Sequence, residues 1–523
     1  MAKNIILCSD GTGNADIKGR GTNVFKLFEA VDLNEYRTNP ALDAQLAFYD
    51  DGVGTNGSVF ARIMGNATGY GLAANVKQLY RELSRVYDPG DRIYLFGFSR
   101  GAFTVRTLAD MIGKCGVLQG EKFSTYKDLR LAVDAAHTAY RAYYDSWLTK
   151  AFVSLTGRPD GPTRVREFQE KFTPYTNVEI EFVGVWDTVD AVGLPFAIAD
   201  TVNTLIYQFK FPDRLLGDHV RYAAHALSLD DDRRAFEPVL WELALKDVDR
   251  IEQVWFAGVH SNVGGGYPKQ GMSLVALDWM LAHAEAHGLR LQSIDNELFR
   301  GHASVDDMMY NPRAGLGLFY RWAPRDVRAY CARSGIGPRI HLTAAERIAH
   351  GTDDYAPGNI PPGTTVAFTP VGDKDERVRQ RKLDILQDRA TAVQDVINRA
   401  HERHGYPLDA VRGYVRLGDW SYWLFILAWA CLAALIVAIG IETLDYGHFV
   451  WHWWILGLLS GTVLLFAVAS LLSRFVDNRL SDKFSKFWHP YQPQLRKALK
   501  HAHAAARAQA RGEAPPPAAR AVG

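Results

Sequence analysis

Hydrophobic and polar positions follow two alternating patterns through the first 260 residues. Helical spacing of apolar residues follows a possible cap at Thr22 or Asn23 and recurs over Ala73–Tyr87. Short apolar runs predict buried strands at Ile5–Cys8, Leu46–Tyr49, Arg92–Phe98, Val178–Trp186 and Ile251–Gly258. Because strands that alternate with helices form parallel sheets, we predict an α/β fold with helices on both faces of a mostly parallel sheet.

Later segments change character and suggest the domain boundaries. Residues 120–175 are tyrosine-rich and helical in pattern, and fit either an inserted cap or plain core helices. Asp375–His404 predicts a charged amphipathic helix. We therefore expect a catalytic domain over 1–372, a helical connector over 373–418, a hairpin over 419–473 and a basic tail over 474–523 that is disordered at its end.

Two long runs near the C-terminus lack any charged residue. They cover Trp420–Ile441 and Tyr446–Ser473, and the short link Glu442–Asp445 joins them. Each contains the roughly 20 apolar residues that a bilayer crossing requires. Tryptophans lie near their ends, as interfacial aromatics do. The pattern predicts a transmembrane hairpin, and the alternative is a buried helical hairpin of a soluble core.

Basic residues flank this predicted hairpin, but the link has none. Arg412 and Arg416 precede it, whereas Arg474, Arg479, Lys483 and Lys486 follow it. The positive-inside rule then places both flanks in the cytoplasm. The N-terminal stretch MAKNIILCSDGTGN has too short an apolar run for a secretory signal. We expect a protein of the bacterial inner membrane, with its catalytic domain and tail facing the cytoplasm.

The charge balance refines this picture. Lys and Arg total 59 and Asp and Glu total 58 in 523 residues, which argues against a nucleic-acid partner. The charge is unevenly placed, because residues 474–523 carry +7 and the remainder carries −6. Such a tail favours an anionic lipid surface. Four cysteines without a C-x-x-C pair exclude a disulfide scaffold and give no sign of a zinc site.

One motif indicates the chemistry. Gly97-Phe98-Ser99-Arg100-Gly101 matches G-x-S-x-G, and it follows a predicted strand and opens a predicted helix. This context is typical of a sharp turn that presents a nucleophilic serine hydroxyl. We interpret Ser99 as the nucleophile, and the alternative is a merely structural tight turn. The Arg100 amide, at the start of the helix, is a candidate oxyanion donor.

The partners of Ser99 are predicted from position. Asp187 directly follows one predicted strand and His260 directly follows another, so both should emerge at the sheet edge that carries Ser99. Asp190 lies close to Asp187 as an alternative acid. Two other histidines, His219 and His225, fall in segments with a helical pattern and are expected at packing or surface positions.

Five ordered strings strengthen this interpretation: IILCSDGTGN, GFSRGA, FVGVWDTVD, WFAGVHSNVGGGY and YAPGNIP. Over residues 1–370 they resemble the catalytic domain of type VI secretion lipase effectors, a family of α/β hydrolases. The resemblance implies a Ser-Asp-His triad at Ser99, Asp187 and His260, and hydrolysis of phospholipid esters. Many relatives have Asp where this chain has Asn262, so the resemblance offers no second acid beside the histidine. Effectors are exported, whereas this chain carries a predicted membrane hairpin.

The loop after the first strand is a second candidate. Ser9–Asn14 is similar to the D-x-D-G-T loop of phosphohydrolases, but Cys8 occupies the position of their nucleophilic aspartate. The Gly11 and Thr12 amides could instead supply a second oxyanion donor. Asp10 either supports the site or caps the turn. Asp230, Asp231 and Asp232 could hold a metal, although adjacent acids are more typical of a solvated loop.

These observations favour a membrane-anchored serine esterase. In this hypothesis Ser99 attacks an ester carbonyl, His260 is the general base and Asp187 orients it. No metal or cofactor is required. The expected partners are the lipid bilayer and a phospholipid or acyl-ester substrate. The alternatives are a tethered esterase or thioesterase for soluble acyl substrates, and a catalytically silent hydrolase fold that binds a lipid or a partner.

Overall fold

The computed structural model describes residues 2–11, 21–51, 70–144, 159–189, 214–244, 247–313, 320–372, 375–446 and 453–500. Within these residues, eight strands form a single sheet in the order β2-β1-β3-β4-β5-β6-β7-β8. Every neighbouring pair is parallel. The strands are β1 (Asn4–Ser9), β2 (Gln45–Asp50), β3 (Arg92–Phe98), β4 (Ile180–Trp186), β5 (Val220–Ser228), β6 (Ile251–Phe256), β7 (Arg339–His341) and β8 (Thr365–Ala367).

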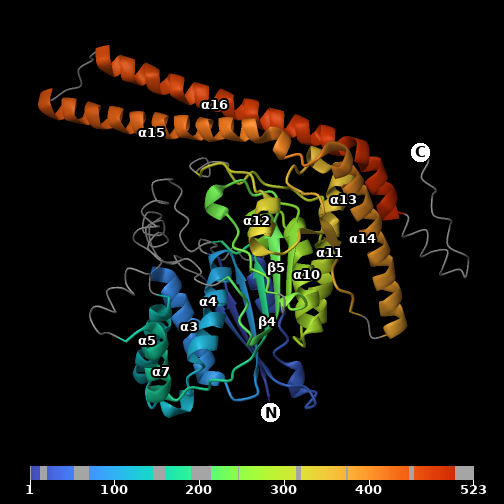
Figure 1. The fold of residues 1–523 in the computed structure, drawn as a ribbon. Coiled ribbons are helices and arrows are strands. Elements are labelled where there is room, and N and C mark those ends of the chain that lie inside the picture. Colours follow the sequence, from blue (N-terminus) through green and yellow to red (C-terminus); the bar gives the residue numbers. More distant parts are fainter. Residues whose placement is uncertain are drawn as a thin grey trace, which may run out of the picture.

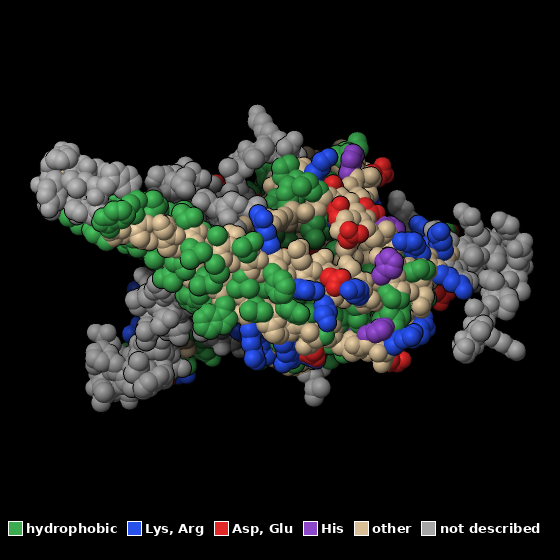
Figure 2. Space-filling model, turned by 90° about the horizontal axis from the view of Figure 1, so that it is seen from above, with side chains coloured by type: hydrophobic (Ala, Val, Ile, Leu, Met, Phe, Trp, Pro, Cys, Tyr) green, Lys and Arg blue, Asp and Glu red, His purple; other side chains and the backbone are tan. Residues whose placement is uncertain are grey.

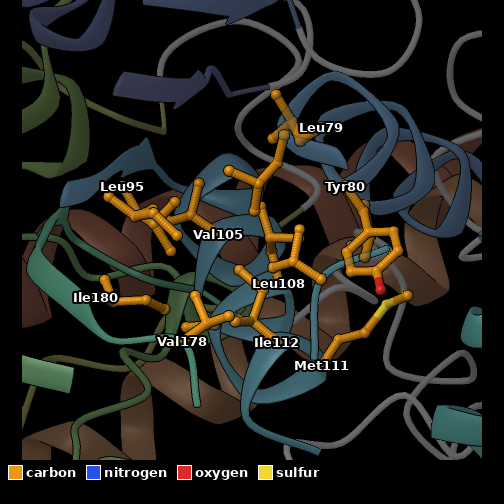
Figure 3. Close-up of a cluster of buried hydrophobic side chains, with 14 of the residues drawn as sticks. Leu79, Tyr80, Leu95, Val105, Leu108, Met111, Ile112, Val178 and Ile180 are labelled. Carbon is orange, nitrogen blue, oxygen red and sulfur yellow. The ribbon is translucent and has the colours of Figure 1, made fainter. Parts of the chain in front are cut away.

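Helices cover both faces of this sheet. Successive strand residues point to opposite sides, so buried strands present apolar side chains on each face. Ile5 and Leu7 of β1 pack with one group of helices, and Ile6 and Cys8 pack with the other. Figure 3 shows the core that contains Ile5 and Leu7, where residues of two helices pack against the sheet. Its helices are α3 (Tyr70–Val86), α4 (Arg100–Cys115), α5 (Tyr126–Tyr143) and α7 (Gly161–Phe172), and the opposite face carries α1 (Asn23–Ala30) and α10 (Gly271–Ala286).

The predicted α/β fold with a parallel sheet is therefore confirmed. The five predicted strands correspond to β1, β2, β3, β4 and β6, and Thr22 caps α1 as proposed. The helical interpretation of the segment around His219 and His225 is wrong. His225 lies inside β5, and His219 lies in the turn before it. Because β5 is a central strand, most of its residues are buried and its sequence lacks the alternation that marks an exposed strand.

The described helices of the tyrosine-rich region are core helices. Leu129, Val133 and Tyr140 of α5, and Val165 and Phe168 of α7, belong to the core that α3 and α4 share. Figure 1 shows α5 and α7 beside α3 and at the opposite end of the molecule from the C-terminal helices. Of the two interpretations left open by the sequence, this packing fits plain core helices.

The other described helices lie near the C-terminal end of the chain or between the last strands. α9 (His260–Gly264) and α11 (Ser293–His302) flank α10. They are followed by α12 (Val327–Ser334), α13 (Leu342–His350), α14 (Glu376–His404), α15 (Arg412–Tyr446) and α16 (Trp453–Trp488). The predicted connector helix corresponds to α14, which Asp375 caps.

Two of these helices form a long antiparallel pair. α15 and α16 run side by side away from the body of the domain (Figure 1). In the described residues, the segments Asp409–Ile441 and Trp453–Lys500 are long and apolar enough to cross a membrane. Figure 2 shows that hydrophobic side chains cover the projecting part, and many of them are exposed, including Trp420, Ile436, Val437, Val463, Leu464 and Leu471.

The base of this helix pair is fixed to the domain. Val476 and Leu480 of α16 pack with Trp322, Tyr406 and Val411. Further along, Phe487 and Trp488 join the core formed by α13 and α14, and the Trp488 indole N–H donates to Pro357 O at 2.7 Å. Consequently the projecting part is apolar and exposed while its base is buried against protein.

Candidate active site

Ser99 lies at the sharp turn between β3 and α4. Its φ of 58° and ψ of −121° are unusual for a residue with a side chain, and they mark local strain. The motif glycines make the turn possible. A Cβ on Gly97 would lie 2.5 Å from Gly101 O, and a Cβ on Gly101 would lie 2.0 Å from Ser9 O. The G-x-S-x-G pattern thus reflects close approach of β3, α4 and the end of β1.

This turn lies at the point where the strand order reverses. β2 lies on one side of β1 and β3 on the other, so the chain leaves β1 and β3 in opposite directions across the sheet. In open parallel sheets, such a point leaves a crevice at the carboxyl ends of the strands, where ligands bind. Ser99 follows β3 and Asp10 follows β1, so both lie at this edge.

The Asp10 side chain organises the loop after β1. It is buried, its Oδ1 accepts the Gly11 N–H at 2.6 Å and its Oδ2 accepts the Tyr49 hydroxyl at 2.6 Å. The Thr22 hydroxyl also donates to Oδ2. Asp10 therefore caps the turn and ties it to β2 and α1, and the Gly11 amide is engaged by this carboxylate. Thr12 and Asp190 lie outside the described residues.

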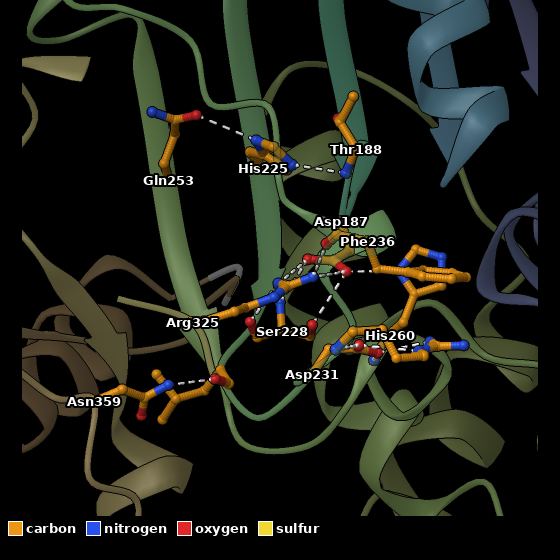
Figure 4. A network of polar contacts seen from close by, with 12 residues as sticks. Asp187, Thr188, His225, Ser228, Asp231, Phe236, Gln253, His260, Arg325 and Asn359 are labelled. Carbon is orange, nitrogen blue, oxygen red and sulfur yellow. Dashed lines mark hydrogen bonds and ion pairs between the residues drawn. The ribbon is translucent and has the colours of Figure 1, made fainter. Parts of the chain in front are cut away.

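Asp187 and His260 form a buried pair at the same edge of the sheet (Figure 4). Asp187 directly follows β4, and His260 follows the short loop after β6. His260 Nδ1 lies 2.5 Å from Asp187 Oδ2. The side chain of Asp187 is fully buried, and that of His260 nearly so. Since an ionised carboxylate can only accept, the Nδ1–H donates to it, which leaves Nε2 of the neutral ring as an acceptor.

Further donors hold the Asp187 carboxylate. Its Oδ1 accepts the Ser228 N–H at 2.9 Å, and its Oδ2 accepts the Ser228 hydroxyl at 3.1 Å. The Arg325 guanidinium donates to both oxygens, at 2.7 and 2.9 Å. Burial alone would raise the pKa of Asp187, but Arg325 and His260 outweigh it and hold that pKa well below its usual range. Asp187 is therefore ionised at neutral pH.

Aromatic rings and charged groups enclose His260. Its ring packs against Phe98 at 4.6 Å and against Phe236 at 4.9 Å between centroids. Burial lowers the pKa of His260 below its usual value, although Asp187 and Asp231 oppose that shift. The imidazole is thus neutral at pH 7, which is the form that a general base requires.

Ser99 lies beside the residues that surround the Asp187–His260 pair. Phe98, which packs on the His260 ring, directly precedes Ser99, and the Ser99 N–H donates to Trp186 O at 3.0 Å, next to Asp187. Within the described residues, no hydrogen bond joins the Ser99 hydroxyl to His260. The Arg100 N–H lies in the first turn of α4, and burial lowers the pKa of the Arg100 side chain to about 10.

The acidic run Asp230–Asp232 is not a solvated loop. Asp231 is buried and accepts the His260 N–H at 3.1 Å, and it pairs with Arg233 at 2.7 Å. A second carboxylate therefore lies beside the histidine, although Asn262 is not an acid. Among the described residues, no cluster of histidine, cysteine or acidic side chains could hold a metal ion.

Asn262 supports the backbone rather than the charged pair. Its side-chain oxygen accepts the Val259 N–H at 3.4 Å, and its amide group donates to Met308 O at 3.1 Å. It thereby braces the turn that presents His260.

The sequence does not predict that Ser228, Asp231 and Arg325 are partners of the Asp187–His260 pair. Ser228 and Asp231 could have been found from their place at the end of a strand, whereas Arg325 has no such signal.

The fold and this site define an α/β protein with a serine at a strained strand-to-helix turn and a buried Asp–His pair beside it. A family model described as "T6SS, Phospholipase effector Tle1-like, catalytic domain" matches residues 3–283, which is more than half of the chain. The chain therefore belongs to the Tle1-like family of type VI secretion system phospholipase effectors, as its sequence motifs predicted. Membership supports a lipase or phospholipase function.

Individual relatives add little about activity. An uncharacterized protein of Saccharomyces cerevisiae, YEL023C, is 30% identical over 249 residues, which cover 45% of this chain and 32% of that protein. The chain thus spans about a third of the length of that curated relative. A crystal structure of an uncharacterized protein from Pseudomonas aeruginosa is 19% identical with a TM-score of 0.35, and covers 75% of this chain and 59% of its own.

Proposed function

We propose that this chain is a membrane-anchored serine hydrolase that cleaves carboxylic esters of membrane phospholipids. The observation that carries the proposal is the buried hydrogen bond between Asp187 and His260 at the sheet edge where Ser99 occupies a strained turn. A nucleophile, a base and an orienting acid are the parts that ester hydrolysis by a serine enzyme requires. Family membership supports the lipid substrate.

In the proposed reaction, the Ser99 oxygen attacks the ester carbonyl while His260 Nε2 takes the hydroxyl proton. Asp187 holds the ring and stabilises the imidazolium that forms. The imidazolium then gives the proton to the leaving alcohol, and an acyl-enzyme remains on Ser99. Water, activated by the same histidine, releases the fatty acid. Closing Ser99 Oγ onto Nε2 belongs to the substrate-bound state, since catalytic hydrogen bonds are often long before substrate binds.

The negative charge on the attacked oxygen needs donors. The Arg100 N–H at the start of α4 is one, because backbone amides at a helix N-terminus favour an anion. The Gly11 amide becomes a second donor if it exchanges its bond to Asp10 for one to the substrate. Thr12 is the alternative. In this proposal Asp10 positions the loop and Asn262 braces the histidine turn.

The proposal also assigns the parts of the chain. An α/β-hydrolase-like catalytic domain covers 1–372, a helical connector 373–418, a transmembrane hairpin 419–473 and a basic tail 474–523. Exposed apolar side chains on α15 and α16 support the hairpin, since such a surface is unfavourable in water. Basic residues at its two flanks favour a catalytic domain and tail in the cytoplasm, at the inner membrane.

Labelling with a fluorophosphonate, which reacts with activated serines, tests the nucleophile. We expect the full chain in detergent to be labelled and Ser99→Ala to remain unlabelled. Ser84→Ala is the matched control, because Ser84 is a buried serine whose hydroxyl donates within its own helix, to Tyr80 O. It should be labelled like the unchanged chain.

The same experiment separates the alternatives. An unchanged chain that is not labelled, beside a known serine hydrolase that is, would favour a silent hydrolase fold. Labelling that is equal in Ser99→Ala would make the assignment of Ser99 wrong. Labelling together with hydrolysis of soluble acyl esters only would favour a tethered esterase or thioesterase.

A further inference from the structure

Arg325 approaches the proposed catalytic acid from a distant part of the sequence. It lies 138 residues beyond Asp187, and its side chain is 2% exposed. Nη1 donates to Asp187 Oδ1 at 2.7 Å and Nη2 to Oδ2 at 2.9 Å, so the guanidinium and carboxylate face each other in a bidentate pair. Such a pair fixes the plane of the carboxylate as well as its charge.

The same guanidinium joins three pieces of the site. Besides Asp187 at the end of β4, Nη1 donates to Ser228 O at the end of β5 at 2.6 Å. Nη2 donates to Phe236 O at 2.6 Å. The Phe236 ring packs on His260. Arg325 therefore holds both the acid that orients the imidazole and a residue that packs against its ring.

Asp187 depends on such partners because its backbone is unusual. Its φ of 38° lies in the left-handed region, which residues with side chains rarely adopt. In addition, rotation of a carboxylate about its side chain would turn Oδ2 away from His260 Nδ1. The two bonds from the guanidinium and the two from Ser228 prevent this rotation.

The charge of Arg325 also affects the imidazole. The charged groups that act on His260 are Asp187, Asp231 and Arg233, and Arg325 acts on the Asp187 carboxylate. An isolated carboxylate would strongly favour the imidazolium, whereas one that shares its charge with a guanidinium favours it less. Removal of this cation should therefore make His260 easier to protonate.

We propose that Arg325 is a positioning residue for ester hydrolysis: it fixes the Asp187 carboxylate toward His260 and offsets the charge of that carboxylate. The inference rests on the proposed function, because it gives Asp187 and His260 their catalytic roles. It extends the Ser-His-Asp arrangement by a fourth, buried and cationic member that does not touch the substrate.

Three variants of the full chain in detergent test this proposal, with 4-nitrophenyl butyrate as the substrate. Arg325→Met removes the cation, and Arg325→Lys keeps it but loses the bidentate geometry. Arg347→Met is the matched control, because Arg347 is equally buried and donates to Val305 O and Asp307 O instead. We expect kcat of Arg325→Met to fall on the order of 10²-fold with little change in KM.

The pH dependence distinguishes positioning from general support of the fold. In Arg325→Met the acid limb of kcat/KM should move upward by about one pH unit, because the Asp187 carboxylate beside the imidazole has lost the cation that offsets its charge. In Arg325→Lys the limb should stay in place while kcat falls at least about tenfold, since the single ammonium cannot fix the carboxylate plane. The limb of Arg347→Met should match the unchanged chain.

Two results would overturn the proposal. One is an acid limb of Arg325→Met at the same pH as that of the unchanged chain. The other is a kcat of Arg325→Lys that lies within threefold of the kcat of the unchanged chain. If Arg325→Met fails to fold, kcat of Arg325→Lys decides. Failure of the proposed function looks different, because the unchanged chain would then neither hydrolyse the ester nor be labelled at Ser99.

Discussion

At the scale of single residues, burial determines the chemistry of the proposed site. Asp187 has no exposure to water and His260 very little, so the charges around them act with little screening. Ser99 is itself buried at its turn. Ser228, Arg325 and Asp231 form hydrogen bonds or ion pairs with this pair, which is the condition under which buried charges are stable.

This burial predicts the pH dependence of activity. Burial disfavours the imidazolium and lowers the pKa of His260 below its usual value near 6.5. The neutral base should therefore persist to lower pH, and kcat/KM should stay on its plateau until the pH falls below about 6.5. A profile from pH 4 to 9 with a soluble ester measures this. An acid limb centred above pH 7 would contradict it.

Gly101 offers a second prediction at this scale. A Cβ there would lie 2.0 Å from Ser9 O and 2.6 Å from Asp10 O, both backbone atoms that cannot move alone. We expect Gly101→Ala to lower the free energy of unfolding by about 1–3 kcal/mol and to reduce activity. Gly301→Ala on α11 is the control, because no heavy atom lies within 4 Å of the added carbon. Thermal unfolding compares the two, and equal stabilities would contradict the close approach.

The sequence predicts that Ser99, Asp187 and His260 lie at one edge of the sheet, because each follows a strand and parallel strands end at the same edge. It could not locate Arg325. That residue lies far from Asp187 in the sequence and outside any strand, and the sequence alone does not distinguish a buried arginine from an exposed one. The prediction of a solvated loop at Asp230–Asp232 is wrong because the sequence does not reveal that Asp231 is buried and paired with Arg233.

At the scale of elements, the base of the helix pair α15–α16 is joined to the segment that carries Arg325. Arg321 donates to both oxygens of Asp419 in α15, at 2.6 and 2.8 Å. The adjacent Trp322 is buried against the base, where a Cβ on Gly418 would lie 2.4 Å from its ring. Arg321 and Arg325 are four positions apart, so the base of the helix pair and the proposed acid both contact one short segment.

The two contacts should differ in strength. Arg321 and Asp419 are partly exposed, and such ion pairs contribute about 1 kcal/mol or less. Loss of a buried tryptophan costs about 3–5 kcal/mol. We therefore expect Trp322→Ala to destabilise the chain in detergent several times more than Asp419→Asn. Thermal unfolding of both variants measures the difference, and a larger effect of Asp419→Asn would show that the ion pair dominates.

Strand β5 shows where pattern reading fails for an element. Its sequence, VRYAAHALS, is buried from Ala223 to Ser228 because strands and helices cover it on every side. A fully buried strand loses the polar–apolar alternation, and a short apolar run with alanines then resembles a helix. The outer strands β7 and β8 have three residues each, which is too short for any periodicity to appear.

At the scale of the whole molecule, the chain combines a folded α/β domain with a projecting apolar pair of helices. Val437 and Val463 lie on that pair and are 60% and 59% exposed. If the pair crosses a bilayer, arginine at these positions costs about 2.5–3.5 kcal/mol each. We expect Val437→Arg with Val463→Arg to release the chain from membranes that are washed at high pH.

The matched control for this prediction is Leu131→Arg. Leu131 lies on α5, is 57% exposed and belongs to the α/β domain, so its replacement should leave the chain in the membrane fraction. If the unchanged chain itself appears in the soluble fraction, the membrane anchor is wrong. The exposed apolar surface would then have to be covered by protein.

Release of free fatty acid from phospholipid vesicles by the full chain and by Ser99→Ala tests the central claim most directly. Ser84→Ala serves as the folded control that keeps Ser99. We predict that the unchanged chain and Ser84→Ala release fatty acid, and that Ser99→Ala releases it at least about 10³-fold more slowly. Equal release by Ser99→Ala, or no release by a chain that binds the vesicles, would contradict a serine phospholipase.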